Sequence, residues 1–256
     1  MQPEYHQAIT RRPGPGIVRG LRERDHGDPD PTLAHDQHEA YVSQLKACGL
    51  DVDILNADPA LPDNVFVEDT AICLPDCAVL TNPGAPSRRG EVASVHEALK
   101  RYYEVIHRIT APGTLDGGDV LEVGDHYFIG LSARTNEEGA DQLIQILNEF
   151  GLTGSTVIFS GFLHLKSGVS WLGEETLLLT EGFGQLTAFS SFDQIVVPDN
   201  EAYAANAVMI NGRVLLAAGY PETLALVETA GFETVTLEMS EFHKVDGGLS
   251  CLSLRF

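Results

Sequence analysis

The last thirteen residues of the chain, Lys244 to Phe256, read KVDGGLSCLSLRF. The stretch Val245–Gly248 has the composition of a tight turn, and the apolar residues after it favour a short β-strand with Cys251 in its middle. Chain ends are usually loose, but a strand-forming end is expected to be held in a sheet. A thiol just past two glycines is suitably placed for a nucleophile, since glycine lets a ligand approach the backbone closely. An isolated cysteine can equally be a small buried apolar side chain.

Upstream of this terminal strand, a strand, a tight turn and a second strand recur at intervals of about 40 to 50 residues, usually with a helix after them. The copies cover residues 65–81 with a helix over 90–103, residues 117–130 with a helix over 137–150, residues 164–180, and residues 206–217 with a helix over 221–230. A fifth copy is the Cys251 strand, completed by an N-terminal strand around Ala8. Each unit is too small to bury its own apolar face, so the pattern predicts a closed ring of five repeats in one α/β domain over residues 1–256. A two-domain α/β arrangement is the alternative, although no linker is visible between residues 50 and 256.

The segment between the first strand and the first repeat has a different composition. Residues 13–31 hold four prolines, four glycines and many charges, with Leu21 as an isolated apolar residue. Such a stretch is not expected to pack into a core, and it predicts a long mobile lid loop. A helix over 32–48, ended by Gly49, and a strand over 52–55 follow it.

Composition limits the partners and the compartment. The formal net charge of −21 disfavours nucleic acid and anionic membranes, and it suits a small cationic ligand or simply a soluble surface. The chain contains no apolar run long enough to span a bilayer and no apolar signal core, so we expect a cytoplasmic protein. Cys48, Cys73 and Cys77 are expected to be structural thiols in the reduced state, because no second Cys/His pair at a suitable spacing completes a zinc site.

In a ring of repeats, equivalent positions point toward one axial cavity. The polar residues that open the repeats are therefore expected to converge, although each could separately be turn chemistry. They are Asp63, Glu68, Asp69, Asp116, Asp119, His164 and Cys251. Carboxylates disfavour a thiolate but attract a cation, and attack on a bound guanidinium reconciles the two, because its positive charge would favour the thiolate.

Five motifs in this chain resemble those of the dimethylarginine dimethylaminohydrolase family, over about residue 8 to the C-terminus. They are DNVFVED (63–69), LDGGDV (115–120), SARTN (132–136), LHLKS (163–167) and DGGLSC (246–251). That family belongs to the guanidino-group-modifying, or pentein, enzymes, so the resemblance implies a five-bladed α/β propeller. It also implies hydrolysis of Nω-methylated arginines to citrulline and an alkylamine, with no metal or organic cofactor.

The resemblance also implies the roles of individual residues. Cys251 matches the nucleophile that forms a covalent thiouronium, and His164 matches the acid and base that protonates the amine and activates water. Asp116 and Asp69 match acids around the guanidinium. The substrate's α-carboxylate and α-amine would be bound by the remaining matching residues. Arg88 and Arg134 match the residues that bind the carboxylate, with Arg89 as an alternative to Arg88. Asp63, with the carbonyls of Leu21 and Val245, matches the site of the amine, and Glu68 belongs to the same polar cluster.

Two other functions remain open from the residues. An arginine deiminase or a citrulline-hydrolysing enzyme of the same superfamily would share Cys251 and His164, although deiminases usually carry an extra helical insertion that this chain lacks. A non-catalytic ribosome-binding protein on the same ring would have no need of those two residues. The expected partner is thus a small methylated arginine, and the expected assembly is a monomer or a homodimer.

Overall fold

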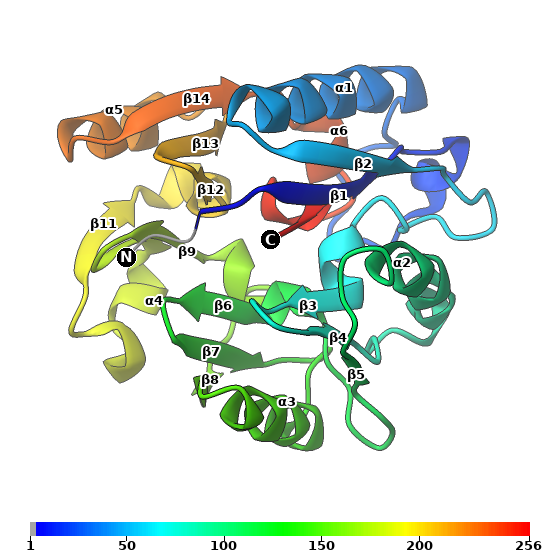
Figure 1. Cartoon of the computed structure of the whole chain (residues 1–256). Coiled ribbons are helices and arrows are strands. Elements are labelled where there is room, and N and C mark those ends of the chain that lie inside the picture. The colour runs from blue at the N-terminus through cyan, green and yellow to red at the C-terminus, as the bar shows by residue number, and fades with distance from the viewer. Residues whose placement is uncertain (1–3) are drawn as a thin grey trace.

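Residues 4–256 of the computed structural model are described here, and within them five three-stranded sheets surround one axis (Figure 1). In each sheet the innermost strand runs antiparallel to the middle strand, and the outer strand runs parallel to the middle one. From inside to outside, the sheets are β15 (Ser253–Arg255), β1 (Gln7–Arg11) and β2 (Asp51–Leu55); β3 (Ala71–Cys73), β4 (Ala78–Leu80) and β5 (Ile106–Arg108); β6 (Val120–Val123), β7 (His126–Leu131) and β8 (Thr153–Ile158); β9 (Val169–Gly173), β10 (Thr176–Thr180) and β11 (Asp193–Val197); and β12 (Val208–Ile210), β13 (Arg213–Ala217) and β14 (Glu233–Leu237). This is the five-bladed α/β propeller that the resemblance implied.

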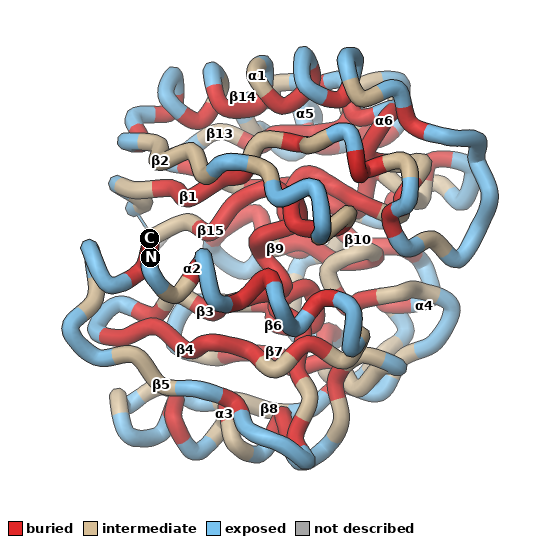
Figure 2. Tube along the Cα trace, turned by 90° about the vertical axis from the view of Figure 1, so that its right-hand side faces the viewer, coloured by how far each residue is buried: buried red, intermediate tan, exposed pale blue. Residues whose placement is uncertain are grey.

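Helices cover the outside of the ring, and buried residues concentrate in the strands within it (Figure 2). The helices are α1 (Pro31–Ala47), α2 (Val92–Leu99), α3 (Glu137–Glu149), the short α4 (Glu181–Gly184), α5 (Pro221–Thr229) and the short α6 (Ser240–His243). Side-chain caps define where two of them start, because the first N–H groups of a helix lack partners within it. The carboxylate of Asp30 accepts from the amides of Thr32 and Leu33, and Asn136 accepts from the amide of Gly139. None of these helices, among residues 4–256, combines the length and apolar character needed to cross a bilayer.

The two ends of the chain close the ring. Strand β15 pairs antiparallel with β1, with Ala8 opposite Arg255 and Thr10 opposite Ser253. This pairing confirms the prediction that the C-terminal strand is completed by the N-terminal one. It also holds the segment that carries Cys251 by backbone hydrogen bonds on a strand far away in sequence.

A short 3-10 helix precedes the innermost strand of every blade. These helices are Val67–Thr70, Gly117–Asp119, Leu165–Ser167, Asp199–Ala205 and Ser250–Leu252, before β3, β6, β9, β12 and β15 respectively. Because the innermost strands are equivalent, the five 3-10 helices meet at one end of the axis. The loops that follow the antiparallel middle strands reach the same end, so both kinds of segment can contribute to a single site.

Two sequence predictions need correction. Cys251 does not lie within a strand but in the 3-10 helix Ser250–Leu252, because Leu249 and Leu252 are both fully buried three residues apart, on the same side of a 3-10 turn. The expectation that residues 13–31 lack core packing is wrong for Pro15–Arg19, a 3-10 helix whose Ile17 is 1% exposed. Residues 21–28 are mostly exposed, and their mobility stays a prediction.

Candidate active site

A pocket lies at the end of the axis where the 3-10 helices meet. Its lining comprises Leu21, Asp63, Phe66, Asp69, Arg88, Arg134, Leu163, His164, Val245, Asp246, Gly247 and Cys251. Of the ten residues expected in the site, the structure brings eight into this lining, and it places Asp116 and Glu68 elsewhere. Loops that follow the middle strands β1, β4 and β7 supply Leu21, Arg88 and Arg134, whereas Asp69, His164 and Cys251 come from the 3-10 helices or their first residues.

His164 lies between two carboxylates. Its Nε2 is 3.1 Å from Oδ2 of Asp116, and its Nδ1 is 3.9 Å from Oδ1 of Asp69. Burial lowers the pKa of His164, but the carboxylates of Asp69, Asp119 and Asp116 outweigh it and raise that pKa to about 9. The imidazole is therefore protonated near neutral pH, in the form that can donate a proton to a leaving amine.

Asp116 lies behind His164 rather than in the pocket. It is fully buried, and while Oδ2 faces the imidazole, Oδ1 accepts from the amide of Gly84 at 2.9 Å. The resemblance implied an acid beside the guanidinium, and the structure instead gives Asp116 a contact with His164. Asp119 acts on the same segment, because its Oδ1 accepts from the amide of Leu165 at 2.9 Å.

Gly118 lets His164 and Asp69 approach the backbone closely. Its amide donates to Oδ1 of Asp69 at 2.9 Å. A Cβ at this position would lie 2.7 Å from Nδ1 of His164 and 2.9 Å from Oδ1 of Asp69, closer than carbon atoms approach such groups.

We expect Gly118→Ala to displace the imidazole and to lower kcat by about 10- to 100-fold, since a 1 Å misplacement has effects of that order. Steady-state kinetics on the purified variant measure the effect. Gly182→Ala is the matched control, because a Cβ there meets no atom within 4 Å, and its kcat should equal that of the wild type. Equal kcat values for the two variants would contradict the account of Gly118.

Cys251 is a protonated thiol in the free protein. Burial and the nearby carboxylates of Glu68 and Asp69 raise its pKa to about 12, against the opposing effect of the Gly248 amide, which donates to Sγ at 3.4 Å. A raised thiol pKa is what the acidic composition of the site leads us to expect. Positive charge close to Sγ favours the thiolate, as that of Lys166 does in the free protein and as that of a bound cation would do further.

Asp69 and Arg88 form a buried ion pair at the pocket wall. Oδ2 of Asp69 contacts Nη1 of Arg88, and although burial raises the pKa of Asp69, His164 and Arg88 lower it to about 2. Arg88 is held from the other side by Glu91, which accepts from Nη2 at 2.8 Å and from Nε. Nη2 also donates to the carbonyls of Asp63 and Phe66. These contacts leave one hydrogen on Nη1 for a ligand.

Arg134 is the less constrained arginine of the pocket. Among the residues that the structure describes, its guanidinium has no hydrogen bond or ion pair, so all of its donors can face a ligand. Arg89, the alternative to Arg88, is exposed and directs Nε to the carbonyl of Pro83 at 3.1 Å, outside the pocket lining. Oδ1 of Asp63 accepts from the amide of Leu21 at 2.8 Å, which holds the first residue of the exposed stretch 21–28 against the site.

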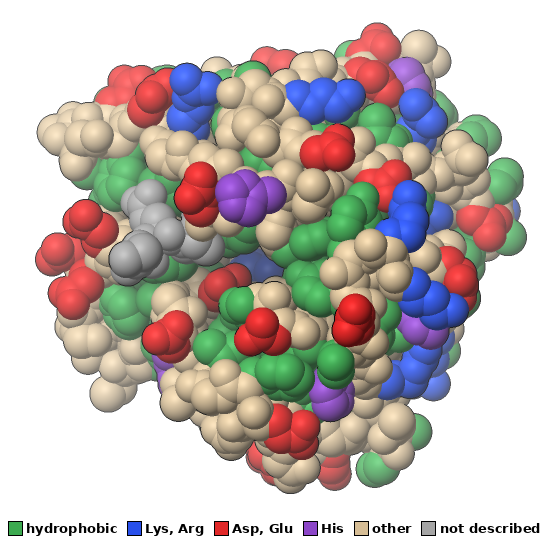
Figure 3. Space-filling view, viewed as in Figure 1, with side chains coloured by type: hydrophobic (Ala, Val, Ile, Leu, Met, Phe, Trp, Pro, Cys, Tyr) green, Lys and Arg blue, Asp and Glu red, His purple; other side chains and the backbone are tan. Residues whose placement is uncertain are grey.

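Glu68 faces away from this pocket, into a second cavity of about 120 Å³. That cavity is lined by residues of all five innermost strands, and Figure 3 shows a face of the molecule that is hollowed near its centre, with basic side chains at the bottom. Both oxygens of Glu68 are engaged: Oε1 accepts from Lys166 at 2.6 Å and Oε2 from Ser250 at 2.8 Å. The expected place of Glu68 among the substrate-binding residues is therefore not supported, because its carboxylate belongs to the floor between the two cavities.

Three side chains of the site lie close enough together to suggest a metal site. Ligand atoms of Asp69, Asp116 and His164 are within 4.8 Å of one another. The two carboxylates already accept hydrogen bonds from Gly118 and Gly84, and Asp69 also pairs with the Arg88 cation. Such a set suits a guanidinium better than a divalent ion, and the absence of a metal requirement stays a prediction.

The five-bladed ring, with a partly buried cysteine, a histidine and carboxylates at one end of its axis, defines a guanidino-group-modifying enzyme. The family model described as "N,N dimethylarginine dimethylhydrolase, eukaryotic" matches residues 25–166. The N(G),N(G)-dimethylarginine dimethylaminohydrolase of Pseudomonas aeruginosa is 44% identical over 253 residues, which cover 98% of this chain and all of the relative. The chain belongs to the dimethylarginine dimethylaminohydrolase family.

Solved structures agree with this assignment. A cysteine-to-serine mutant of the Pseudomonas aeruginosa enzyme, complexed with citrulline, superposes with a TM-score of 0.97 at 43% identity, covering 99% of this chain and 100% of that one. A dimethylarginine dimethylaminohydrolase with a histidine-to-glycine replacement, as an adduct with S-methyl-L-thiocitrulline, gives a TM-score of 0.97 at 43% identity, covering 98% and 100%.

Proposed function

We propose that this protein hydrolyses Nω-methylated arginines to citrulline and dimethylamine or methylamine through a covalent intermediate on Cys251. The observation that carries the proposal is that Cys251, His164 and the carboxylate of Asp69 line one pocket, in a chain 44% identical to a dimethylarginine dimethylaminohydrolase over its length. A bound guanidinium would place a further positive charge beside Cys251 and so lower the pKa of its thiol.

The pocket offers a complementary group for each charge of the substrate. Asp69 would accept hydrogen bonds from the guanidinium, and Asp63 would bind the α-ammonium with the carbonyls of Leu21 and Val245. Arg134 would bind the α-carboxylate, assisted by the remaining Nη1 hydrogen of Arg88. Leu21 lies on the exposed segment next to the pocket, so a lid over the bound amino acid follows from the same arrangement.

The reaction then takes two steps. With the guanidinium bound, the Cys251 thiol loses its proton to solvent. The thiolate attacks the guanidinium carbon, and the C–N bond to the methylated nitrogen breaks as His164 gives that nitrogen a proton. The product is an alkylamine and a thiouronium on Cys251. A water molecule then attacks the same carbon while His164 takes one of its protons. Cleavage of the C–S bond releases citrulline, and the second water proton passes to the sulfur and restores the Cys251 thiol.

We also infer that Asp116 positions His164 and keeps it protonated. Replacing Asp116 by Asn removes one of the carboxylates that raise the pKa of His164, so that pKa should fall from about 9 and the protonated fraction at neutral pH should decrease. We expect kcat to drop by at least about tenfold. A pH titration of the His164 imidazole by NMR measures the shift, and an unchanged or higher pKa in Asp116→Asn would contradict the inference.

The enzyme is proposed to act in the cytoplasm on a small free amino acid, as a monomer or a homodimer. All four cysteines are free thiols, which supports a reducing compartment.

The proposal is tested by incubating the protein with asymmetric dimethylarginine and quantifying both products. Equimolar citrulline and dimethylamine are the expected result. Formation of neither product by folded protein would overturn the proposal.

A further inference from the structure

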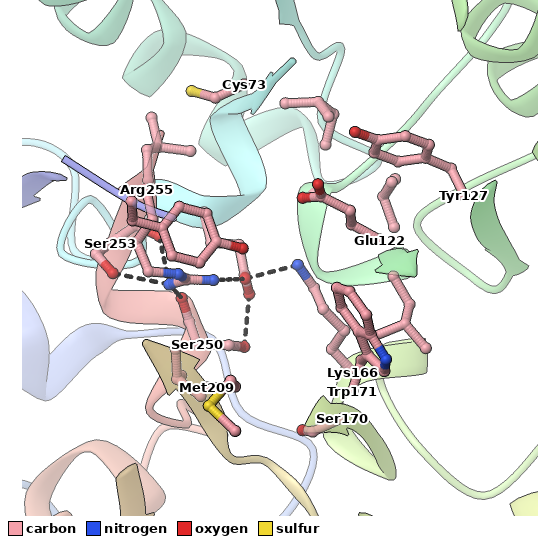
Figure 4. A pocket seen from close by; sticks show the side chains of 18 of the residues that line it. Cys73, Glu122, Tyr127, Lys166, Ser170, Trp171, Met209, Ser250, Ser253 and Arg255 are labelled. Carbon is pink, nitrogen blue, oxygen red and sulfur yellow. Dashed lines mark hydrogen bonds and ion pairs between the residues drawn. The ribbon is translucent and has the colours of Figure 1, made fainter. Parts of the chain in front are cut away.

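Four residues form a closed hydrogen-bonded ring in the floor between the two cavities, three of them buried and the fourth, Lys166, partly buried. Nδ2 of Asn206 donates to the carbonyl of Lys166 at 2.8 Å and to Oγ of Ser250 at 2.9 Å, and its Oδ1 accepts from the amide of Ser250 at 3.0 Å. Ser250 donates to Glu68, and Glu68 accepts from Nζ of Lys166, which completes the ring. Lys166, Ser250 and Arg255 converge in Figure 4 on this carboxylate.

The other three members of the ring lie one or two residues along the chain from three residues of the proposed catalytic pocket. The pairs are Glu68 and Asp69, Lys166 and His164, and Ser250 and Cys251. Each pair comes from a different blade, on or beside its 3-10 helix. The distances around the ring therefore determine how the nucleophile, the acid and the guanidinium-binding carboxylate are spaced on the other side of the floor.

Asn206 occupies a similar place in a fourth blade, shortly before its innermost strand β12. It follows the 3-10 helix Asp199–Ala205 directly, and it is 5% exposed. It does not line the pocket that holds His164 and Arg134, and it lines a neighbouring cavity together with Gly248 and Cys251. Its amide group is the connection between the Cys251 segment and the His164 segment.

The backbone beside Cys251 is packed directly against Asn206. A Cβ on Gly248 would lie 2.4 Å from Oδ1 of Asn206, so this glycine permits a contact that other residues would prevent. The amide of the same Gly248 donates to Sγ of Cys251. A shift of Asn206 would consequently move both Ser250 and the donor that contacts the thiol.

We propose that Asn206 is a positioning residue of this enzyme, which aligns Cys251 with His164 by holding Ser250 and the Lys166 carbonyl together. The proposal rests on the proposed function for its kinetic readout. Because Asn206 acts through Cys251 and not on substrate, its loss should change kcat and the reactivity of the thiol, and should leave substrate affinity largely unaltered.

The test compares the wild type with Asn206→Ala. We expect kcat for asymmetric dimethylarginine to fall by about 10- to 100-fold while KM changes by less than about threefold. The pH dependence of Cys251 alkylation by iodoacetamide should also shift, because the Gly248 donor and the floor charges move relative to Sγ. Gln37→Ala is the matched control, since Gln37 is also a buried amide, 6% exposed, that bonds Ser240 and the amide of Glu241 outside the ring.

A double-mutant cycle with Ser250→Ala separates a role within the ring from a general packing effect. If both residues act through the ring, the double variant should be little slower than Asn206→Ala alone. Should Asn206→Ala fail to fold, Ser250→Ala removes the hydroxyl that joins Asn206 to Glu68 and must itself lower kcat by about tenfold with little change in KM.

The proposal is overturned if folded Asn206→Ala keeps the kcat and the alkylation profile of the wild type, or if Gln37→Ala produces the same changes as Asn206→Ala. It is also overturned if the factors by which Asn206→Ala and Ser250→Ala lower kcat simply multiply in the double variant. These outcomes are distinct from failure of the proposed function. If the wild type does not consume methylated arginine, the iodoacetamide profile of Asn206→Ala still reports whether Asn206 controls the environment of Cys251.

Discussion

Replacing Cys251 by serine is expected to abolish citrulline formation, with a loss of more than about 10³-fold in kcat. A serine hydroxyl is far less acidic than a thiol, and the carboxylates of Glu68 and Asp69 oppose its ionisation further. The bound guanidinium can offset the charge for sulfur but not for oxygen. The measurement is citrulline release by Cys251→Ser at saturating asymmetric dimethylarginine.

The same variant should keep its structure, because serine is close to cysteine in size and Cys251 makes a single weak contact with the Gly248 amide. A thermal midpoint within a few degrees of the wild type is the control. Substantial turnover by folded Cys251→Ser would contradict the assignment of the nucleophile. Cys48→Ser serves as the comparison, since Cys48 lies in a core cluster outside the pocket, and it should retain full kcat.

Replacing His164 by glycine is expected to separate formation of the covalent intermediate from its hydrolysis. Without the imidazole, an amine leaves poorly and no base activates the water. S-methyl-L-thiocitrulline carries a thiolate leaving group that needs less protonation, so the adduct on Cys251 should form with this compound and persist. Overall turnover of asymmetric dimethylarginine should fall by about 10²- to 10⁴-fold.

Intact-mass spectrometry of His164→Gly after incubation with S-methyl-L-thiocitrulline measures the adduct. Peptide mapping should place the added mass on Cys251, and Cys251→Ser should show none. An unmodified His164→Gly protein, or an adduct that hydrolyses as fast as in the wild type, would contradict the division of roles between the two residues.

Repetition in the sequence made much of the fold predictable. Five copies of a two-strand unit, the last completed by the strand at Ala8, predict a closed ring, and the register of Ala8 opposite Arg255 confirms the closure. The 3-10 helices were not predicted, because a turn of three or four residues leaves no periodic pattern that distinguishes it from the start of a strand. This is why Cys251 was placed within a strand, whereas it precedes one.

Motif resemblance identified the residues of the site but not the side of the floor on which each lies. Glu68 and Asp69 are adjacent in sequence and diverge, one to Lys166 and Ser250 and the other to the pocket. Asp116 similarly lies behind His164. Such differences depend on the backbone angles of a few residues, which spacing alone does not reveal.

Glu91 and Asn206 were missed as parts of the site. Glu91 follows Arg88 by three residues, and its role emerges only from the buried contact with that guanidinium. Asn206 did have a signal, since it opens the fourth repeat as His164 opens the third. Comparing equivalent positions among the repeats would have singled it out.

The most direct test of the account compares asymmetric dimethylarginine, monomethylarginine and free arginine as substrates in one assay, with the amine product identified. The account predicts that both methylated substrates yield citrulline with dimethylamine or methylamine, at kcat/KM values well above that for free arginine. Reaction of free arginine alone, with release of ammonia, would contradict it and indicate a deiminase built on the same site.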